Sequence, residues 1–537
     1  MNSIVNSNFK QFYPKVENAL KKASFIAIDA EFSGIKKSNV ADLSLFDSMP
    51  ERYGKLRDHI NPFIAIQIGL TAFKYIRDEN KYIAEPFSFY LLPRPLPFDE
   101  RQFSWQVGAI EFLTRHNFKF DKLNYEGISY LNEQEEFRLR KSLKDDYISI
   151  NQETFDNIED EEKFSQTIDK VAKWLENSDA SEKGLEIHCD NVIQQYCLQK
   201  QLRNCFKKVW TEPKENSIVV IKVSPETKEI LKEQDDNSLD KEIIDYYLGF
   251  TKVFKLLMTL KKPIMGHNIL LDLMFIYKQF YKPLPNKYSD FKSEINRIFP
   301  SVYDTKFISY ELKKVLNSDH WKSNILSELY TFFTRGCGQP LCISSPKIEF
   351  ENDIITEKFH DAGWDSYCSG FCFIKCAYVH AIEKRKSSTN VVFAELTNTE
   401  IFYGVKEYIN CVNIIRADLS YIRLDGEDPS STRPPWLSIK TKSSIPLDIG
   451  DLFEVLSSFR PVAIKPYSKE SVLVAATSYR NTKAIMKYLS RNNDYQVVVY
   501  NPMRKLLVRK SIIWSGLIVS GGLLTWFLRV SLTNSPS

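Results

Sequence analysis

The pattern of apolar and polar positions in the first half of the chain predicts a helix followed by strands. Positions 8–23 favour a helix, and the almost continuously apolar run "FIAIDAEF" (25–32) predicts a buried strand. Two further runs, 61–76 and 87–94, are rich in β-branched and aromatic residues, which favours strands. From residue 263 a short strand, "PIMGHN", and an apolar helix, "ILLDLMFIYKQF", follow. These elements predict an α/β core.

Two other stretches differ from this core in their patterns. Charged positions surround one predicted strand, "NSIVVIKVS" (216–224), which indicates a small α/β insertion. After the linker "DGEDPSSTRPP" (425–435), the order is strand, helix, strand, strand, helix, strand, as in an RNA-recognition motif (RRM). The expected domains are a core split into 1–155 and 246–424, an insertion at 156–245 and an RRM-like domain at 434–503.

The last apolar run of the chain predicts a membrane anchor. Residues 511–528, "SIIWSGLIVSGGLLTWFL", carry no charge. As a helix they span about 27 Å, close to the roughly 30 Å of a bilayer core. Basic residues precede the run, and Trp514 and Trp526 lie near its ends, where interfacial indoles belong. A buried C-terminal helix is the alternative. We expect a tail-anchored protein that faces the cytosol.

Composition limits the classes of function. The chain has 537 residues, which is too long for one hydrophobic core. With 72 basic and 68 acidic residues its net charge is +4, so a site for a polyanion must be a local patch. Nine cysteines without a C-x-x-C pair argue against a disulfide framework or a zinc ribbon and favour a reducing compartment.

Acidic residues stand out at three places in the apolar pattern. Asp29 and Glu31 end the strand at 25–32 and point to the same face, where two carboxylates about 7 Å apart repel unless a divalent cation lies between them. Asp272 lies one turn inside an apolar helix, and Asp365 follows His360 by five positions near a helix start. Simpler interpretations are a solvated strand end, the outer face of an amphipathic helix, and helix capping.

Taken together, the three places resemble a known nuclease family. The combination of D-x-E, one helical Asp and H-x4-D resembles the DEDD exonucleases of the histidine subtype, which have a ribonuclease H-like fold. The stretches "VYDTKFIS", "GHNILLDLMFIYKQFYKPLP", "EFLTRHNFKFDKLNYEGISYLNEQEEFRLR" and "HDAGWDSYCSGFCF" resemble poly(A)-specific ribonuclease (PARN) and its relatives. The resemblance covers nearly all of residues 20–503 and implies a hydrolase acting on RNA.

The resemblance implies a catalytic constellation. Asp29, Glu31, Asp272 and Asp365 are expected to hold two Mg²⁺ ions about 4 Å apart. His360 is expected to act as the general base for the attacking water, since the pKa of imidazole suits that task at neutral pH. Cleavage is expected to run 3′→5′ and to release nucleoside 5′-monophosphates.

Further residues gain roles by the same resemblance. Phe32 and Ile35 match family positions that touch the terminal nucleotides, and Lys306 matches a substrate-contacting lysine. Core packing is the alternative for Phe32 and Ile35. Asp304, a fifth acid, is implied to be structural support, and His267 is expected to be a hydrogen-bonding residue at a strand end.

The C-terminal span makes the membrane-anchored PARN-like exonucleases the nearest branch. That branch implies single-stranded precursors of PIWI-interacting RNAs as substrate, a Tudor-KH protein and PIWI proteins as partners, and the mitochondrial outer membrane as location. Basic residues around the span favour mitochondria over the endoplasmic reticulum. A membrane-bound poly(A) deadenylase and a catalytically silent RNA-binding scaffold stay open as alternatives.

Some positions depart from the family pattern. The insertion lacks an Arg-x3-His signature, and the strands "LSIKTK" and "SVLVAAT" lack the aromatic residues that stack bases, which makes the RRM-like domain degenerate. Its sheet can instead serve as a surface for a homodimer or another partner. Cys368, Cys372 and Cys376, spaced by four, predict a buried stripe rather than a metal site.

Overall fold

The structure of the chain is a computed structural model with two compact units. Unit 1 comprises Met1–Asp42, Tyr53–Ile414 and Tyr421–Pro429, and unit 2 comprises Leu43–Arg52, Ile415–Ser420 and Ser430–Ser537. The residues that the structure describes are 2–96, 99–144, 158–177, 184–189, 192–214, 217–234, 238–316, 323–351, 358–386, 394–431, 433–442, 447–459, 461–491 and 494–500.

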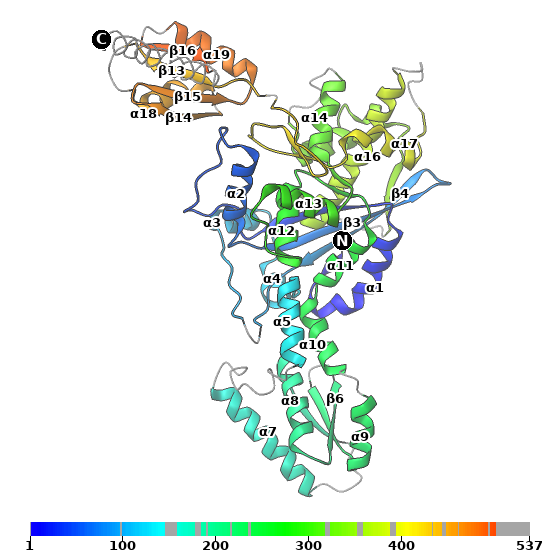
Figure 1. Ribbon diagram of the computed structural model, residues 1–537. Helices are drawn as coiled ribbons and strands as arrows, with labels where there is room; N and C mark the ends of the chain where they lie inside the picture. Colours follow the sequence, from blue (N-terminus) through cyan, green and yellow to red (C-terminus); the bar gives the residue numbers. More distant parts are fainter. Residues whose placement is uncertain are drawn as a thin grey trace, which may run out of the picture. The chain divides into compact units, whose positions relative to one another are not determined.

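A seven-stranded mixed sheet forms the centre of unit 1 (Figure 1). Its strand order is β1-β4-β3-β2-β8-β9, with β10 also paired to β4. β3 runs antiparallel to both of its neighbours, β2 and β4, whereas β8 runs parallel to β2 and β9 parallel to β8. The strands are β1 (Asn2–Ile4), β2 (Phe25–Phe32), β3 (Ala65–Ile76), β4 (Lys81–Tyr90), β8 (Ile264–Gly266), β9 (Val302–Asp304) and β10 (Lys347–Phe350).

The predicted strands of the core are present, but two have different bounds: the strand predicted at 61–76 is Ala65–Ile76, and the one predicted at 87–94 is Lys81–Tyr90. β4 begins at Lys81, six residues before the predicted start at 87, because Asn80 takes a left-handed conformation (φ 44°) that closes the hairpin turn from β3. The first half of β4 alternates between half-buried and buried residues, as expected of a strand with one face less covered.

Helices of unit 1 surround this sheet. α16 packs against β2, β3 and β4, and its Cys368, Cys372 and Cys376 are fully buried, as predicted for the cysteine stripe. The helices are α1 (Asn6–Lys22), α2 (Met49–Ile60, beginning in unit 2), α3 (Val107–Arg115), α4 (Phe120–Glu126), α5 (Glu133–Lys144), α10 (Ser238–Leu248), α11 (Thr251–Leu260), α12 (Leu270–Phe280), α13 (Tyr288–Ile298), α14 (Thr305–Val315), α15 (Leu326–Thr334), α16 (Ala362–Lys386) and α17 (Asn398–Gly404).

Short elements complete the core of unit 1. A two-stranded antiparallel sheet joins β11 (Cys411–Asn413) to β12 (Tyr421–Arg423). Single 3-10 turns lie at Gln339–Cys342 and Lys406–Tyr408.

The predicted insertion has a small hydrophobic core. Its elements are α7 (Ile158–Asn177), β5 (Leu185–His188), α8 (Val192–Cys205), β6 (Val209–Lys214), β7 (Ser217–Lys222) and α9 (Pro225–Gln234). The strand predicted at 216–224 is β7, the central strand of the antiparallel sheet β5-β7-β6. Buried Val171, Ile187, Leu202 and Val220 belong to this core. These residues group with unit 1, and a separate domain at 156–245 stays a prediction.

The C-terminal part of unit 2 has the predicted order of elements. β13 (Leu437–Thr441), α18 (Ile449–Val455), β14 (Val462–Ser468), β15 (Ser471–Ala476), α19 (Tyr479–Ser490) and β16 (Tyr495–Val499) form a four-stranded antiparallel sheet, β14-β15-β13-β16, with two helices. A 3-10 turn, Ser457–Phe459, follows α18. Leu437, Val474 and Ile485 lie in its core. Assignment to the RRM class stays a prediction.

A segment far away in the chain completes unit 2. The ring of Phe46 lies 5.0 Å from that of Trp436, edge to face, and the ammonium of Lys465 lies 6.0 Å from the centre of the Phe46 ring. Arg52 is buried and donates through Nη2 to the carbonyl of Ile415 at 2.6 Å. Residues 43–52 therefore belong to the packing of unit 2, although unit 1 contains the chain on either side of them.

The predicted membrane span at 511–528 lies outside the described residues. Within the described part of the chain, no helix combines the length and apolar character that crossing a bilayer requires. The anchor stays a prediction.

Candidate active site

The acids of the sequence pattern lie on three elements of unit 1. Side chains alternate along β2, so Asp29 and Glu31 share the face of Phe25, whose ring packs 5.5 Å from Phe373 of α16. β8 pairs in parallel with β2 and leads into α12, which carries Asp272 in its first turn. The sheet register therefore brings the start of α12 to the end of β2, where the backbone of Ala30 lowers the pKa of the Asp272 carboxyl.

A glycine lets the start of α16 approach the same strands. Gly69 of β3 lies opposite Asp29, and a Cβ atom at Gly69 would come within 1.8 Å of the carbonyl oxygen of Ala362. Only a residue without a side chain permits this approach. Asp365 follows one turn into α16 and is buried. The close contact at Gly69 thus places the last acid of the pattern beside β2.

The structure brings these predicted residues together. Ligand atoms of Glu31, His360 and Asp365 all lie within 4.8 Å of one another. Asp29 and Asp272 belong to the same cluster. The pKa values of Asp29 and Glu31 are raised well above the usual range, first by burial and then by the charges of Asp365 and Asp272. The arrangement is a cluster of like charges, of which Asp272 and Asp365 are buried and Asp29 and Glu31 are half-buried.

The chemistry of the cluster fits a divalent cation. Burial raises the pKa of Asp272 to about 8 and that of Asp365 to about 7. The Oδ2 atom of Asp365 accepts a hydrogen bond from the backbone N–H of His360 at 3.0 Å, whereas its Oδ1 atom is buried and lacks a hydrogen-bond partner among the described residues. A buried carboxylate oxygen without a partner is costly, and oxygen ligands of this kind are those that Mg²⁺ prefers.

His360 has a constrained backbone and an aromatic environment. Its φ of 63° is left-handed, and its ring lies 3.9 Å from the ring of His116 and 4.8 Å from that of Phe112, measured between centroids. Burial, and then the charge of His116, lower the pKa of His360 below 6.5. The imidazole is therefore neutral at pH 7 and able to accept a proton.

A further acid, Asp361, was missed by the sequence pattern. It is buried, its Oδ1 accepts hydrogen bonds from Gly363 N (3.1 Å) and Ser88 Oγ (3.2 Å), and its charge adds to the repulsion felt by the predicted acids. Gln67 of β3 accepts from the backbone of Ala362 at 3.1 Å. These bonds fasten the start of α16 to β3 and β4. The only sign of Asp361 in the sequence was its place immediately after His360.

The acid implied to be structural, Asp304, supports the cluster from outside it, because it fixes the residues that begin α12 and its charge raises the pKa of Asp272. The carboxylate of Asp304 is fully buried, caps the N-terminus of α14, and accepts backbone N–H groups of Asn268, Ile269, Lys306, Phe307 and Asn413. Such a set of donors satisfies its oxygens. His267 bonds Thr305 Oγ1 and the carbonyl of Asn324, both at 2.9 Å, as expected of a hydrogen-bonding residue.

The predicted substrate residues have different environments. Phe32 is half-buried and stacks on Phe275 with 4.2 Å between ring centres, whereas Ile35 is 49% exposed. Lys306 is half-buried at the start of α14, where its charge interacts with Asp304 and His267. Their contact with substrate stays a prediction.

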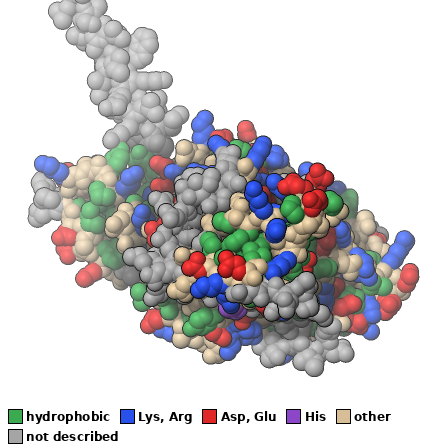
Figure 2. Space-filling view, turned by 90° about the horizontal axis from the view of Figure 1, so that it is seen from below, with side chains coloured by type: hydrophobic (Ala, Val, Ile, Leu, Met, Phe, Trp, Pro, Cys, Tyr) green, Lys and Arg blue, Asp and Glu red, His purple; other side chains and the backbone are tan. Residues whose placement is uncertain are grey.

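An apolar face on α3 was also missed. Phe112, whose ring contacts His360, is 41% exposed, and Ile110 is 38% exposed. Apolar residues in "VGAIEFL" suggest a packed helix, so their exposure depends on tertiary structure. Figure 2 shows Lys and Arg side chains interspersed with acidic and hydrophobic ones over the visible face, in keeping with the small net charge of +4.

Known proteins match this chain over most of its length. A family model described as CAF1 family ribonuclease matches residues 4–373, a range that contains every predicted site residue. The pre-piRNA 3′-exonuclease trimmer of Bombyx mori is 35% identical over 98% of each chain. Poly(A)-specific ribonuclease PNLDC1 of Mus musculus is 28% identical, covering 92% of this chain and 93% of that protein. Poly(A)-specific ribonuclease PARN of Homo sapiens is 29% identical, covering 93% and 79%.

Proposed function

The chain belongs to the CAF1 family of ribonucleases, and on that premise we propose that it is a divalent-metal-dependent exonuclease that trims precursors of PIWI-interacting RNAs. It is a 3′→5′ exoribonuclease. The observation that carries the proposal is the cluster of Glu31, His360 and Asp365 with Asp29 and Asp272. The similarity to the Bombyx mori trimmer, at 35% identity over 98% of both chains, supports the choice of substrate.

In this proposal the four acids Asp29, Glu31, Asp272 and Asp365 hold two Mg²⁺ ions. Bound there, the ions supply activation of the attacking water and charge balance at the leaving 3′ oxygen. His360 accepts the proton of that water through its neutral imidazole, which the hydrogen bond from its backbone to Asp365 holds in position. The products are nucleoside 5′-monophosphates.

Substrate is held by apolar surfaces beside the acids. Phe32 stacks the terminal base, supported from behind by Phe275, and the exposed Ile35 packs beside it. Phe112 borders the ring of His360 and lies where a nucleotide next to the reacting phosphate would pass. Lys306 adds a positive charge for the RNA backbone. Stacking contacts tolerate any base, which suits an enzyme that shortens mixed sequences.

The experiment uses the full-length protein in native membranes with 5′-labelled single-stranded RNA. We expect a ladder of shortened products that EDTA abolishes and added Mg²⁺ restores. Asp272→Asn lowers the rate by about a hundredfold or more, because a metal ligand is lost. Glu328→Gln, an exposed acid on α15, is the matched control and keeps the wild-type rate. Wild-type trimming by Asp272→Asn contradicts the proposal.

A poly(A) deadenylase is the second candidate, and the 28–29% identity to poly(A)-specific ribonucleases favours it. Equal lengths of adenosine-tailed and mixed-sequence RNA separate the two. A strong preference for the adenosine tail supports the deadenylase. RNA binding that is equal with and without EDTA, with no shortening, supports the silent scaffold instead.

The proposal includes a tail anchor at 511–528 in the mitochondrial outer membrane, with the enzyme facing the cytosol. Its support is the uncharged run with basic residues before it. A Tudor-KH protein, PIWI proteins and a second copy of the chain are the proposed partners. Deleting 511–528 should move the protein from the carbonate-resistant membrane fraction to the supernatant, and retention in that fraction would exclude this anchor.

A further inference from the structure

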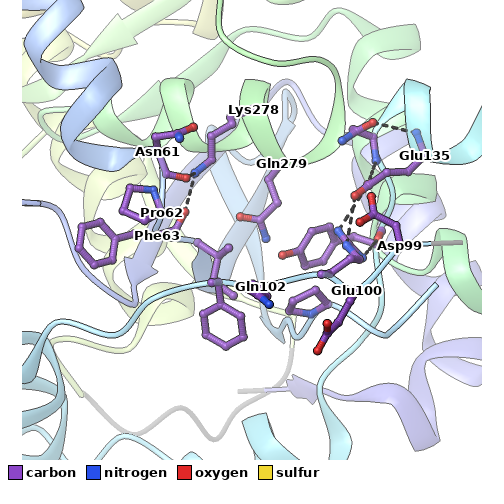
Figure 3. Close-up of a pocket in the computed structure, with 15 residues that line it drawn as sticks. Asn61, Pro62, Phe63, Asp99, Glu100, Gln102, Glu135, Lys278 and Gln279 are labelled. Atoms are coloured by element: carbon purple, nitrogen blue, oxygen red, sulfur yellow. Dashed lines mark hydrogen bonds and ion pairs between the residues drawn. The ribbon is translucent and has the colours of Figure 1, made fainter. Parts of the chain in front are cut away.

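A lysine of α12 holds the turn that precedes β3. Lys278 Nζ donates to three backbone carbonyls, those of Ile60 (2.9 Å), Asn61 (2.9 Å) and Phe63 (2.5 Å). An ammonium group has three N–H bonds, so all of its donors are used on carbonyls at the end of α2 and just beyond it. Burial lowers the pKa of Lys278 to about 8, and the group therefore stays protonated at pH 7. Figure 3 shows this side chain reaching toward Asn61 and Phe63.

The clamped turn borders open space. A cavity of about 290 Å³ lies beside it, lined among others by Asn61, Phe63, Gln102 and Lys278 (Figure 3). Side chains therefore do not fill the space on that side of the turn, and hydrogen bonds contribute more to holding the turn in place. Gln279, next to Lys278, continues the clamp by bonding both the N–H (2.9 Å) and the carbonyl (3.0 Å) of Ala65.

This turn also supports the residues that follow β2. Ser33 N donates to the carbonyl of Ile64 at 2.9 Å, and Ser33 Oγ accepts from Ile64 N at 3.0 Å. The Phe63 ring lies so close to Gly34 that a Cβ there would be 2.5 Å from a ring carbon. Ile35, 49% exposed, comes next in the chain. Phe63 and Ile64 thus help to position Ile35, whose backbone N–H also donates to Gln106 Oε1 at 3.1 Å.

Lys278 also reaches Phe32 by a second route. Its ammonium lies 5.2 Å from the centre of the Phe275 ring, and Phe275 stacks on Phe32 at 4.2 Å with 19° between the ring planes. A cation over an aromatic ring is attracted to it and restrains its orientation. Both residues that our proposed function assigns to the terminal nucleotide are therefore linked to one lysine.

From this geometry we propose that Lys278 is a positioning residue for the 3′-terminal nucleotide, acting through Phe63 on Ile35 and through Phe275 on Phe32. It does not touch the substrate or the acid cluster. The inference rests on the proposed function, because it names what sets the nucleotide surface of that same site. Loss of the ammonium should weaken RNA binding while leaving the chemical step unchanged.

The test compares Lys278→Met, which keeps an unbranched side chain one atom shorter and removes the ammonium group, with wild type. We expect KM for single-stranded RNA to rise about tenfold with kcat within about twofold. Lys282→Met is the matched control, because Lys282 lies just past the end of α12 but pairs with Glu133 at 3.2 Å. The control keeps the wild-type KM. If Lys278→Met instead lowers kcat about tenfold and leaves KM unchanged, the inference is overturned.

A binding measurement separates this inference from the proposed function. The probe is RNA with 2-aminopurine at its 3′ end, whose fluorescence is quenched by stacking, used with EDTA so that no cleavage occurs. We expect quenching with wild type and Lys282→Met, and its loss with Lys278→Met. Quenching by wild type without trimming under any metal condition contradicts the function alone. Wild-type quenching by Lys278→Met overturns the inference alone.

A second variant covers the case in which Lys278→Met does not fold. Phe63→Leu keeps the lysine and its three carbonyl partners but removes the ring that lies against Gly34. We expect the same rise in KM and the same loss of quenching. A Phe63→Leu protein with wild-type values for both overturns the route through Ile35.

Discussion

At the scale of single residues, the candidate site is a group of buried carboxyls that oppose one another's ionisation. The pKa of Asp272 is raised to about 8 and that of Asp365 to about 7. An acid whose pKa rises on folding stabilises the folded state fully below its unfolded value, here 3.8, and this contribution is lost as the pH rises through 7 and 8. The metal-free protein therefore loses stability from these groups toward alkaline pH.

Metal binding should counter this loss, and more strongly at high pH. Protons compete with a cation for the carboxylates of Asp272 and Asp365 below about pH 7, so the rise in melting temperature caused by Mg²⁺ or Mn²⁺ is expected to be larger at pH 8.5 than at pH 6. Thermal unfolding with the metal and with EDTA at both pH values measures it. Asp272→Asn should reduce the metal effect at pH 8.5. An equal shift at both pH values contradicts this account.

Residue chemistry explains which site residues the sequence could predict. Asp29, Glu31 and Asp272 stand out because each interrupts an apolar run, and the structure brings them toward Asp365. Asp361 has no such contrast, since an acid before a helix is ordinary capping chemistry. Nothing in the sequence marks Lys278, because its three carbonyl partners arise only when residues 60–63 fold against it.

At the scale of secondary-structure elements, the site depends on how α16 meets the sheet. Gly69 lies opposite Asp29 and permits the start of α16 to touch β3, and Gln67 and Ser88 anchor that start through hydrogen bonds. The presence of the strands β2, β3, β4 and β8, and their order along the chain, were predictable from apolar runs. The approach of α16 was not, because a glycine within a strand indicates close contact without naming the partner.

Gly69→Ala tests this contact. A methyl group would lie 1.8 Å from the carbonyl oxygen of Ala362, so α16 must shift away from β3 and carry Asp365 with it. We expect a lower melting temperature, by several degrees, and loss of the metal-induced stabilisation. Gly54→Ala is the control, because a Cβ at Gly54 in α2 meets nothing within 4 Å. It should leave stability unchanged or slightly raised. Wild-type metal response in Gly69→Ala would argue against the contact.

At the scale of the whole molecule, the nine cysteines follow the division between core and surface. Cys205 and Cys337 are exposed, and the other seven are buried. Burial raises the pKa of Cys372 and Cys376 well above its usual range, so these thiols do not ionise at neutral pH. The buried stripe predicted from the spacing of three cysteines is thus chemically protected in the folded chain.

Thiol labelling of the native protein should reflect this division. We expect two cysteines to react rapidly with a soluble disulfide reagent and all nine to react after denaturation. The double variant Cys205→Ser with Cys337→Ser should show no rapid phase. Rapid labelling of Cys372 in the native protein, identified by mass spectrometry, would mean that α16 is not packed as described.

The participation of residues 43–52 in unit 2 affects how this protein can be divided or recombined. Phe46 packs on Trp436 and Arg52 bonds the carbonyl of Ile415, although the partners are 390 and 363 positions apart in the chain. A single cut before residue 430 therefore yields a catalytic fragment that keeps an apolar loop without its cover, and a C-terminal fragment that lacks one of its own packing segments. Unit 2 is therefore not formed by one continuous stretch of chain, and exchange between relatives must transfer its three stretches together.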